Sequence, residues 1–161
     1  MFNKIFPKLH AEGYKFIVIA IISTIVFYNF SSFLGLIGLV LSIWVYYFFR
    51  DPERIIIHDD NYLVSPADGE VIKVEEVDGP KELGLESKKF NKISIFMNIF
   101  DCHVNRTPCR GQVEEILYKP GKFFNASLDK ASEDNERNYY KIKDTHGNNI
   151  IVVQIAGLVA R

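Results

Sequence analysis

The chain has 161 residues, which is the length of one ordinary domain. Its 19 Lys and Arg residues nearly balance its 20 Asp and Glu residues, leaving a formal net charge of −1. This balance gives no electrostatic reason to expect a nucleic-acid partner.

Apolar residues are concentrated near the N-terminus, where residues 16–49 contain no charged side chain. Such a run is too long for a buried helix of a soluble domain or for the core of a signal peptide, so it predicts a membrane segment. A straight helix of this length would reach roughly 50 Å, whereas the hydrocarbon layer is about 30 Å thick. We therefore expect the helix to break within this run.

The polar residues at positions 29–32 predict the break, which divides the run into arms 16–28 and 33–49. The first arm is short, so a tight hairpin and one long tilted span both fit its length. Cationic side chains lie on both sides, in residues 1–15 and at Arg50, and the positive-inside rule then favours a hairpin with both ends in the cytoplasm. We expect the cytoplasmic face of the inner membrane.

Residues 50–161 are predicted to form one β-rich domain, because apolar and polar residues alternate along several short segments. We expect mostly antiparallel strands in a barrel or sandwich-like arrangement behind the helical hairpin. The last two strands read as a hairpin around a polar turn at 144–149, and a long loop spans 121–137. The predicted strands are 70–77, 92–100, 112–119, 138–143 and 150–160.

The stretch SPADGEV at 65–71 predicts a turn, with Gly69 suited to a positive φ. Asp68 lies in this turn. It is more often a turn residue in such a context than a catalytic one, and its residue type allows both.

His103 follows the predicted strand 92–100 in the stretch NIFDCHVNRTP. If the alternation continued, His103 would face the same side as Ile99 and Asp101, away from water. A carboxylate such as Asp68 or Asp101 would fix its tautomer and make it a general base. A partly buried structural histidine fits the spacing equally well.

No metal site is predicted. The candidate ligands are Cys102, His103, Cys109 and His146, but neighbours on a strand point to opposite faces and no zinc-binding spacing occurs. The two cysteines fit a reducing compartment and are most simply small buried apolar residues.

Two cations follow the apolar run in FFRDPER at 48–54. Arg50 and Arg54 are candidates for binding lipid phosphate or carboxylate groups, since the guanidinium group contacts both in a bidentate manner. Ordinary positive charge flanking a membrane segment explains them as well.

Five stretches in this order carry a resemblance to a known family: YFFRDPER, SPADGEV, IFMNIFDCHVNRTP, NASLDKASEDNERN and VQIAGLVAR. Over residues 48–161 the chain resembles the short, membrane-associated bacterial phosphatidylserine decarboxylase proenzymes. The resemblance implies conversion of phosphatidylserine to phosphatidylethanolamine in phospholipid biosynthesis.

The resemblance also implies the cofactor, a covalent pyruvoyl group and no metal. Such proenzymes cut their own chain between a glycine and a serine, and the serine becomes an N-terminal pyruvoyl group on a small α-subunit. That group serves as the electron sink for decarboxylation. By motif match, Asp68 and His103 are the pair that activates the serine, and this chain corresponds to the larger β-subunit.

No serine in this sequence follows a glycine. The resemblance therefore implies a truncated or split proenzyme, inactive without a segment carrying the Gly-Ser site. One alternative is a membrane-anchored, lipoyl-like β-barrel that serves as a binding or adaptor module, in which His103 would be dispensable and solvent-facing. Another is a remnant with no function of its own, whose sheet edge stays uncovered.

Overall fold

The computed structural model describes residues 6–57, 59–125 and 134–160. The chain forms two compact units. The helical unit comprises Met1–Ile56 and Met97–Asn105, and the β unit comprises Ile57–Phe96 and Arg106–Arg161. The loop that carries His103 thus belongs to the same unit as the two N-terminal helices.

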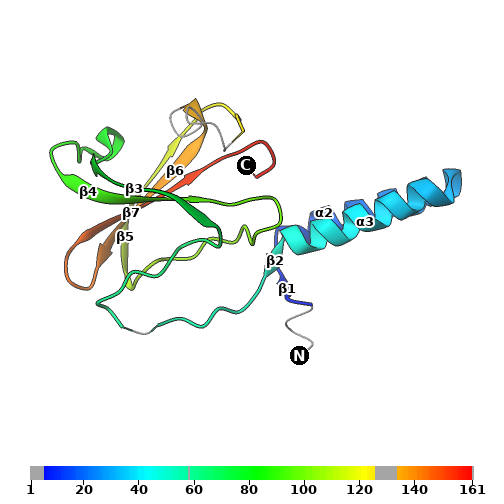
Figure 1. Ribbon diagram of the computed structural model, residues 1–161, viewed down its shortest axis with the longest axis horizontal. Helices are drawn as coiled ribbons and strands as arrows, with labels where there is room; N and C mark the ends of the chain where they lie inside the picture. The colour runs from blue at the N-terminus through cyan, green and yellow to red at the C-terminus, as the bar shows by residue number, and fades with distance from the viewer. Residues whose placement is uncertain (1–5, 58, 126–133, 161) are drawn as a thin grey trace. The chain divides into compact units, whose positions relative to one another are not determined.

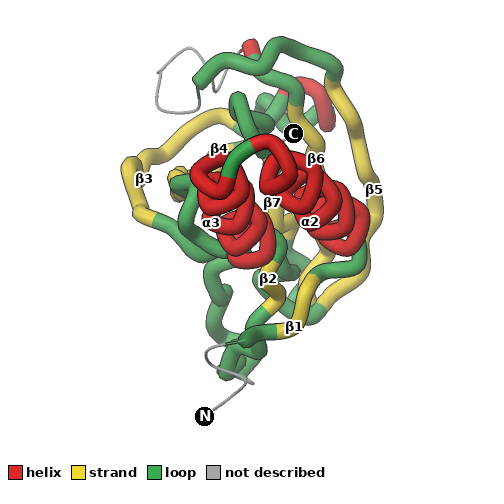
Figure 2. Tube along the Cα trace, turned by 90° about the vertical axis from the view of Figure 1, so that its right-hand side faces the viewer, coloured by secondary structure: helices red, strands yellow, loops and turns green. Residues whose placement is uncertain are grey.

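The helical unit is built on two helices, α2 (Gly13–Phe30) and α3 (Ser32–Phe48), which lie side by side (Figures 1 and 2). Ser31 alone joins them. Its backbone is extended, its N–H donates to the Phe27 carbonyl, and its side chain accepts from the Phe33 N–H at 3.2 Å, which caps α3. The predicted break at 29–32 is confirmed, because the chain reverses direction there and forms a helical hairpin.

Small residues allow the two helices to approach closely. A Cβ atom on Gly38 would lie 2.8 Å from Thr24 Oγ1, and one on Gly35 would lie 2.6 Å from the Tyr28 ring. One turn further along, the hydroxyls of Thr24 and Ser42 lie 3.0 Å apart and share a hydrogen bond. Close backbones joined by a polar pair are typical of helices that pack in a membrane.

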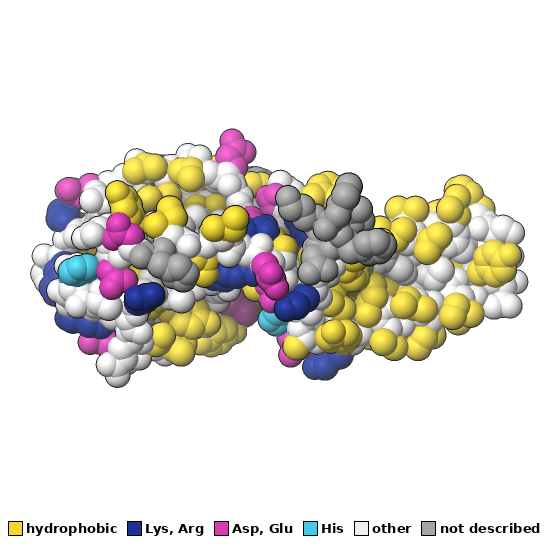
Figure 3. All heavy atoms as spheres, turned by 90° about the horizontal axis from the view of Figure 1, so that it is seen from below, with side chains coloured by type: hydrophobic (Ala, Val, Ile, Leu, Met, Phe, Trp, Pro, Cys, Tyr) yellow, Lys and Arg dark blue, Asp and Glu magenta, His cyan; other side chains and the backbone are white. Residues whose placement is uncertain are grey.

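The outer surface of the hairpin is apolar (Figure 3). α2 is long and apolar enough to cross a membrane, whereas α3, with 17 residues, is a shorter apolar helix. An exposed apolar surface of this extent is not typical of a soluble monomer. Its exposed side chains include Phe16, Ile19, Ile22, Phe33, Leu36, Leu39 and Ile43.

A short antiparallel pair closes the base of the hairpin. Strand β1 (Lys8–Leu9) pairs with β2 (Arg50–Asp51), and the His10 N–H donates to the Phe49 carbonyl at 2.9 Å. The segment before α2 is thereby fixed to the segment after α3.

The β unit contains an antiparallel two-stranded sheet of β3 (Glu70–Asp78) and β4 (Lys89–Phe96). Between them lies the short 3₁₀ helix η1 (Lys81–Leu83), which ends at Gly84 with φ +63°. The predicted strand 92–100 starts earlier and ends earlier than expected, because residues 98–101 form a turn.

The β unit also contains a three-stranded antiparallel sheet in the order β5 (Gly111–Lys119), β6 (Arg137–Asp144), β7 (Asn149–Ile155). Tyr139 and Ile142 of the central strand β6 are buried. The predicted hairpin of the last two strands is confirmed, with the Asp144 carboxylate accepting from the backbone of its turn. β7 ends at Ile155 rather than at 160, because residues 157–160 form a turn closed by a backbone bond.

The expected order of two helices followed by antiparallel β structure is therefore confirmed. The expected barrel is not found in the described ranges, where the sheets have two and three strands and do not close. Of the predicted loop 121–137, residues 126–133 lie outside the described residues. Its described end holds Asn135, which is buried and bonded to Phe124 and to the Ala156 carbonyl.

Candidate active site

The loop before His103 is a compact polar turn. The Asp101 carboxylate accepts from the Asn98 N–H at 2.8 Å, and the Asn98 side chain accepts from the Phe100 N–H at 2.8 Å. The Asp101 N–H donates to the Asn98 carbonyl at 3.0 Å. These bonds end the strand pattern, so the prediction that alternation runs on to His103 is wrong.

His103 is half-buried in the helical unit, beside the end of α3. Its imidazole stacks on the Phe48 ring with centroids 4.3 Å apart and planes 26° apart. Its Nδ1 lies 3.1 Å from the Asp101 carbonyl oxygen. Since a carbonyl oxygen only accepts, this bond requires the proton on Nδ1 and leaves Nε2 as the basic nitrogen.

Burial lowers the pKa of His103, because the charged imidazolium loses solvent. The nearby Arg50 charge acts in the same direction, and both the Asp101 carbonyl and the Asp101 carboxylate act against it. The neutral imidazole that a general base requires is thereby favoured.

The segment around His103 is fixed to the residues after α3. The Arg50 guanidinium donates from Nη1 to the Tyr47 carbonyl at 2.6 Å and from Nη2 to the Phe100 carbonyl at 2.8 Å. The buried Cys102 places Sγ 3.3 Å from the Arg50 carbonyl. Cys102 thus behaves as the predicted small buried residue.

Asp68 is half-buried and lies in the β unit, in a bend just before β3. The bend is held by Ser65, whose hydroxyl donates to the Ala67 carbonyl at 2.7 Å. Gly69 does not have the expected positive φ, which among the described glycines occurs at Gly84 and Gly147. It is required for space instead, since a Cβ atom there would lie 2.4 Å from the Phe96 carbonyl oxygen.

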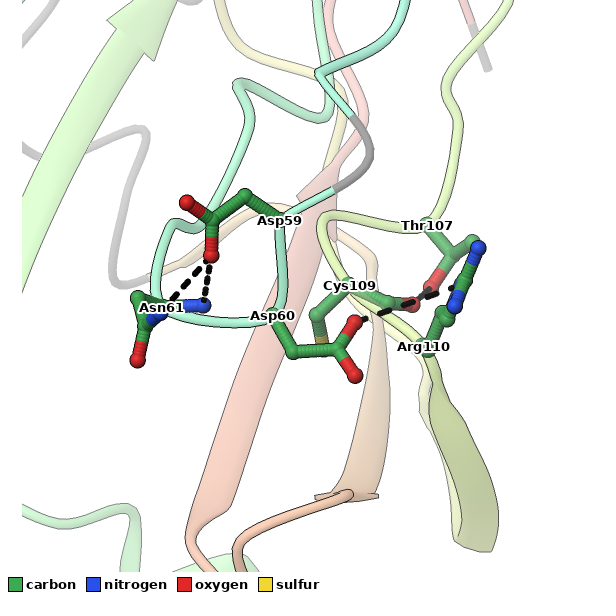
Figure 4. Close-up of polar contacts among 6 residues, drawn as sticks. All are labelled: Asp59, Asp60, Asn61, Thr107, Cys109 and Arg110. Carbon is green, nitrogen blue, oxygen red and sulfur yellow. Dashed lines mark hydrogen bonds and ion pairs between the residues drawn. The ribbon is translucent and has the colours of Figure 1, made fainter.

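Two backbone bonds tie the segment before Asp68 to the segment that follows His103 in the sequence. The Arg106 N–H donates to the Pro66 carbonyl at 2.8 Å, and the Val64 N–H donates to the Pro108 carbonyl at 2.9 Å. Nearby, Asp59 closes a turn onto Asn61 (Figure 4). All of these contacts lie within the β unit.

The remaining polar residues of this region are Asp60, Cys109 and Arg110, which Figure 4 shows together. Arg110 Nε lies 4.0 Å from the Asp60 carboxylate. Burial raises the pKa of the Cys109 thiol, with the Asp144 and Asp60 carboxylates adding to the effect. The thiol is therefore a poor nucleophile at neutral pH.

No group of three or more His, Cys, Asp or Glu side chains suited to a metal ion occurs in the part of the chain that the structure describes. Cys102 and His103 lie in the helical unit, and Cys109 and His146 lie in the β unit. His146 is exposed in the turn after β6.

Phe48 and the Asp101 carbonyl were not identified from the sequence as neighbours of His103. Phe48 belongs to the apolar run and reads there as one more membrane-facing ring. A backbone carbonyl carries no sequence signal. The one available indication was the turn-forming pair Asn98 and Asp101, which interrupts the strand pattern.

The family model described as phosphatidylserine decarboxylase matches residues 41–161. The chain is 80% identical over 161 residues to the phosphatidylserine decarboxylase proenzyme of Pelagibacter ubique, covering all of this chain and 75% of that protein. It is 52% identical over 153 residues to that of Ruegeria pomeroyi, covering 95% of this chain and 70% of the relative. The proenzyme of Cereibacter sphaeroides is 49% identical over 161 residues, all of this chain and 69% of that protein.

The family match covers most of the chain, including both Asp68 and His103. The resemblance drawn from the sequence motifs is thereby confirmed. The chain belongs to the phosphatidylserine decarboxylase family of enzymes.

Proposed function

We propose that this chain is the β-subunit part of a pyruvoyl-dependent phosphatidylserine decarboxylase and that His103 is its general base. The observation that carries the proposal is the state of the imidazole. Nδ1 is bonded to the Asp101 carbonyl, burial favours the neutral form, and Nε2 is the basic nitrogen. A family histidine in this state fits proton transfer from a serine hydroxyl.

In the proposed self-cleavage, His103 Nε2 takes the proton of the serine hydroxyl as its oxygen attacks the carbonyl carbon of the preceding glycine. It returns that proton to the serine nitrogen as the glycine–serine C–N bond breaks, so that an ester replaces the peptide bond. The serine belongs to a segment beyond the present sequence, since no serine here follows a glycine. Once formed, the pyruvoyl group supplies the electron sink for loss of CO₂ from phosphatidylserine. After that loss, the protonated His103 is proposed to return a proton to the product.

Asp68 is proposed as the acidic partner of His103. The family match, which covers both residues, supports this pairing. Because Nδ1 already donates to Asp101, the expected role of Asp68 is to stabilise the imidazolium by its charge.

The helical hairpin is proposed to anchor the enzyme in the inner membrane, at the cytoplasmic face. Its apolar outer surface and its polar Thr24–Ser42 pair support this. Arg54, together with the remaining N–H donors of Arg50, is proposed to bind the phosphate or carboxylate of the phospholipid. The two recorded bonds of Arg50 use two of its five donors.

A small pyruvoyl-bearing α-subunit is the proposed protein partner. The two-stranded sheet supports such a partner, because its cross-strand pair Val74 and Ile93 is 68% and 60% exposed. Ile116 on β5 is 60% exposed. Exposed apolar side chains on neighbouring strands are typical of a surface that another protein segment covers.

The adaptor alternative expects a dispensable, solvent-facing His103. The half-buried imidazole stacked on Phe48 does not fit that expectation. We therefore favour the enzyme.

A fusion protein tests the proposal. The chain is joined to the segment of the Pelagibacter ubique relative that lies beyond its match, and the product is analysed by gel and mass spectrometry. We expect a small fragment with an N-terminal pyruvoyl mass and phosphatidylserine decarboxylation. His103→Ala should lower the rate of cleavage about 100-fold or more. Full cleavage of the His103→Ala fusion would contradict the assignment.

A further inference from the structure

The loop that carries His103 contacts the end of the apolar helix α3. Residues 97–105 belong to the same compact unit as α2 and α3, although about 50 residues separate them from α3 in the sequence. Three side chains make the connection: Phe48, Arg50 and Cys102. The last turn of α3 is thus part of the surroundings of the imidazole.

Phe48 covers one face of the imidazole. It is 9% exposed, stacks on His103 at 4.3 Å and packs on Trp44 of the preceding turn with ring centroids 5.4 Å apart. A ring held on one side by the helix removes water from His103 and limits the rotation of its side chain.

Arg50 holds the other end of the loop. Its two terminal nitrogens donate to carbonyl oxygens of Tyr47, at the end of α3, and Phe100, three residues before His103. The planar guanidinium group holds these two oxygens at a fixed separation, which a lysine ammonium group does not reproduce. Cys102 Sγ adds a weak bond to the Arg50 carbonyl.

We propose that Phe48 and Arg50 are positioning residues that fix His103 for proton transfer, so that the membrane hairpin is part of the catalytic apparatus as well as an anchor. This inference rests on the proposed function, because the positioning of His103 matters for catalysis only if His103 transfers a proton. Neither residue is proposed to touch the reacting atoms through this role.

Imidazole ¹⁵N NMR of the full chain in lipid nanodiscs tests the contact without any catalytic readout. The charged groups recorded at His103 are Asp101 in its own turn and Arg50 from the α3 side. In the parent chain we expect the tautomer protonated on Nδ1. Phe48→Leu should raise the pH at which His103 titrates, because the ring that excludes water is gone, and should weaken the preference for one tautomer.

Arg50→Lys keeps the positive charge and separates positioning from charge. We expect Arg50→Lys to increase the minor tautomer of His103 nearly as much as Arg50→Gln does. Both variants lose the guanidinium group that bonds the carbonyls of Tyr47 and Phe100 at once. In the fusion protein, Phe48→Leu and Arg50→Lys should each slow self-cleavage roughly 10- to 100-fold. If Arg50 acted only through its charge, Arg50→Lys would keep both the tautomer preference of His103 and the cleavage rate.

Two matched controls come from the same end of the hairpin. Phe16→Leu removes a ring whose stacking partner is Phe49, at 4.9 Å, one residue beyond Phe48. Lys15→Gln removes an exposed cation whose recorded partner is Glu12. Neither control should change the His103 spectrum or the cleavage rate.

The outcomes separate the two proposals. An unchanged His103 spectrum in both Phe48→Leu and Arg50→Lys would overturn the positioning role. An equal change in the Phe16→Leu control would also overturn it, by making the effect a general one. Cleavage that persists in His103→Ala overturns the proposed function instead, whatever the spectra show.

Discussion

The Nδ1 atom of His103 lies 3.1 Å from the carbonyl oxygen of Asp101, only two residues earlier in the chain. Because both partners lie in the same turn, a bond within that turn determines which imidazole nitrogen carries the proton. In serine proteases a carboxylate side chain accepts from this nitrogen. Here a backbone carbonyl takes that place, which is why the proposed partner Asp68 is assigned a role through its charge.

The proposed role of His103 as general base predicts the pH dependence of self-cleavage. Its pKa lies below the ordinary value of about 6.5, and the base works in its neutral form. The acid limb of the cleavage rate should therefore be centred below about pH 6.5, where an exposed histidine is half protonated. The rate constant of the fusion protein, measured from pH 5 to 8, checks this.

An acid limb centred at or above the ordinary histidine value would contradict the buried, neutral base. His103→Gln is the control, since any pH dependence left in this variant comes from other groups.

The turn at Asn98 is predicted to support the site through Asp101. Asp101→Ala removes the acceptor of the Asn98 N–H and should cost about 1 kcal/mol of unfolding free energy. It should also slow self-cleavage, because the Asp101 carbonyl moves with the turn. Asp101→Asn keeps an acceptor oxygen and should retain most of both properties. Chemical denaturation and the cleavage rate measure them, and equal losses in the two variants would show that charge rather than the hydrogen bond matters.

Asn135 is predicted to be the most sensitive polar residue of the β unit. Its side chain is 1% exposed, accepts from the Phe124 N–H and donates to the carbonyls of Phe124 and Ala156. Asn135→Ala removes all three bonds to these part-buried backbone groups and should cost roughly 1–3 kcal/mol. Asn61→Ala, in an exposed turn, should change the unfolding free energy by less than about 0.5 kcal/mol. Similar losses in both variants would refute the prediction.

The hydroxyl pair in the hairpin is predicted to make a modest contribution to stability. Thr24→Val removes the bond to Ser42 while keeping the side-chain shape, and should cost about 0.6 kcal/mol, as such bonds between membrane helices do. Gly38→Val should cost more, because its Cβ atom would lie 2.8 Å from Thr24 Oγ1. The fluorescence of Trp44, the single tryptophan, reports thermal unfolding of the hairpin in lipid. A larger loss for Thr24→Val than for Gly38→Val would refute this order.

Patterns local in the sequence predicted much of the fold. The apolar run with polar residues at 29–32 predicted the helical hairpin, because a helix of that length exceeds a membrane. Alternation predicted the five main strands, and the polar turn at Asp144 predicted the last hairpin. Barrel closure was not found among the described residues, because alternation identifies strands but does not fix which of them pair across a sheet.

The site was only partly predictable. Residue type and motif indicated His103, but extended alternation gave the wrong reason for its burial. The turn at Asn98 ends the strand, and a ring from α3 covers the imidazole instead. Contacts between segments about 50 residues apart, such as Phe48 with His103, leave no periodic signal in one sequence. The distance between Asp68 and His103 stays a prediction.

The most direct measurement is the rate at which the fusion protein releases its small fragment, with the fragment's N-terminal mass, in the parent and in His103→Ala. We predict a pyruvoyl-terminated fragment from the parent and a rate at least about 100-fold lower in the variant. An uncleaved parent, or a variant that is cleaved at the parent's rate, would contradict the account.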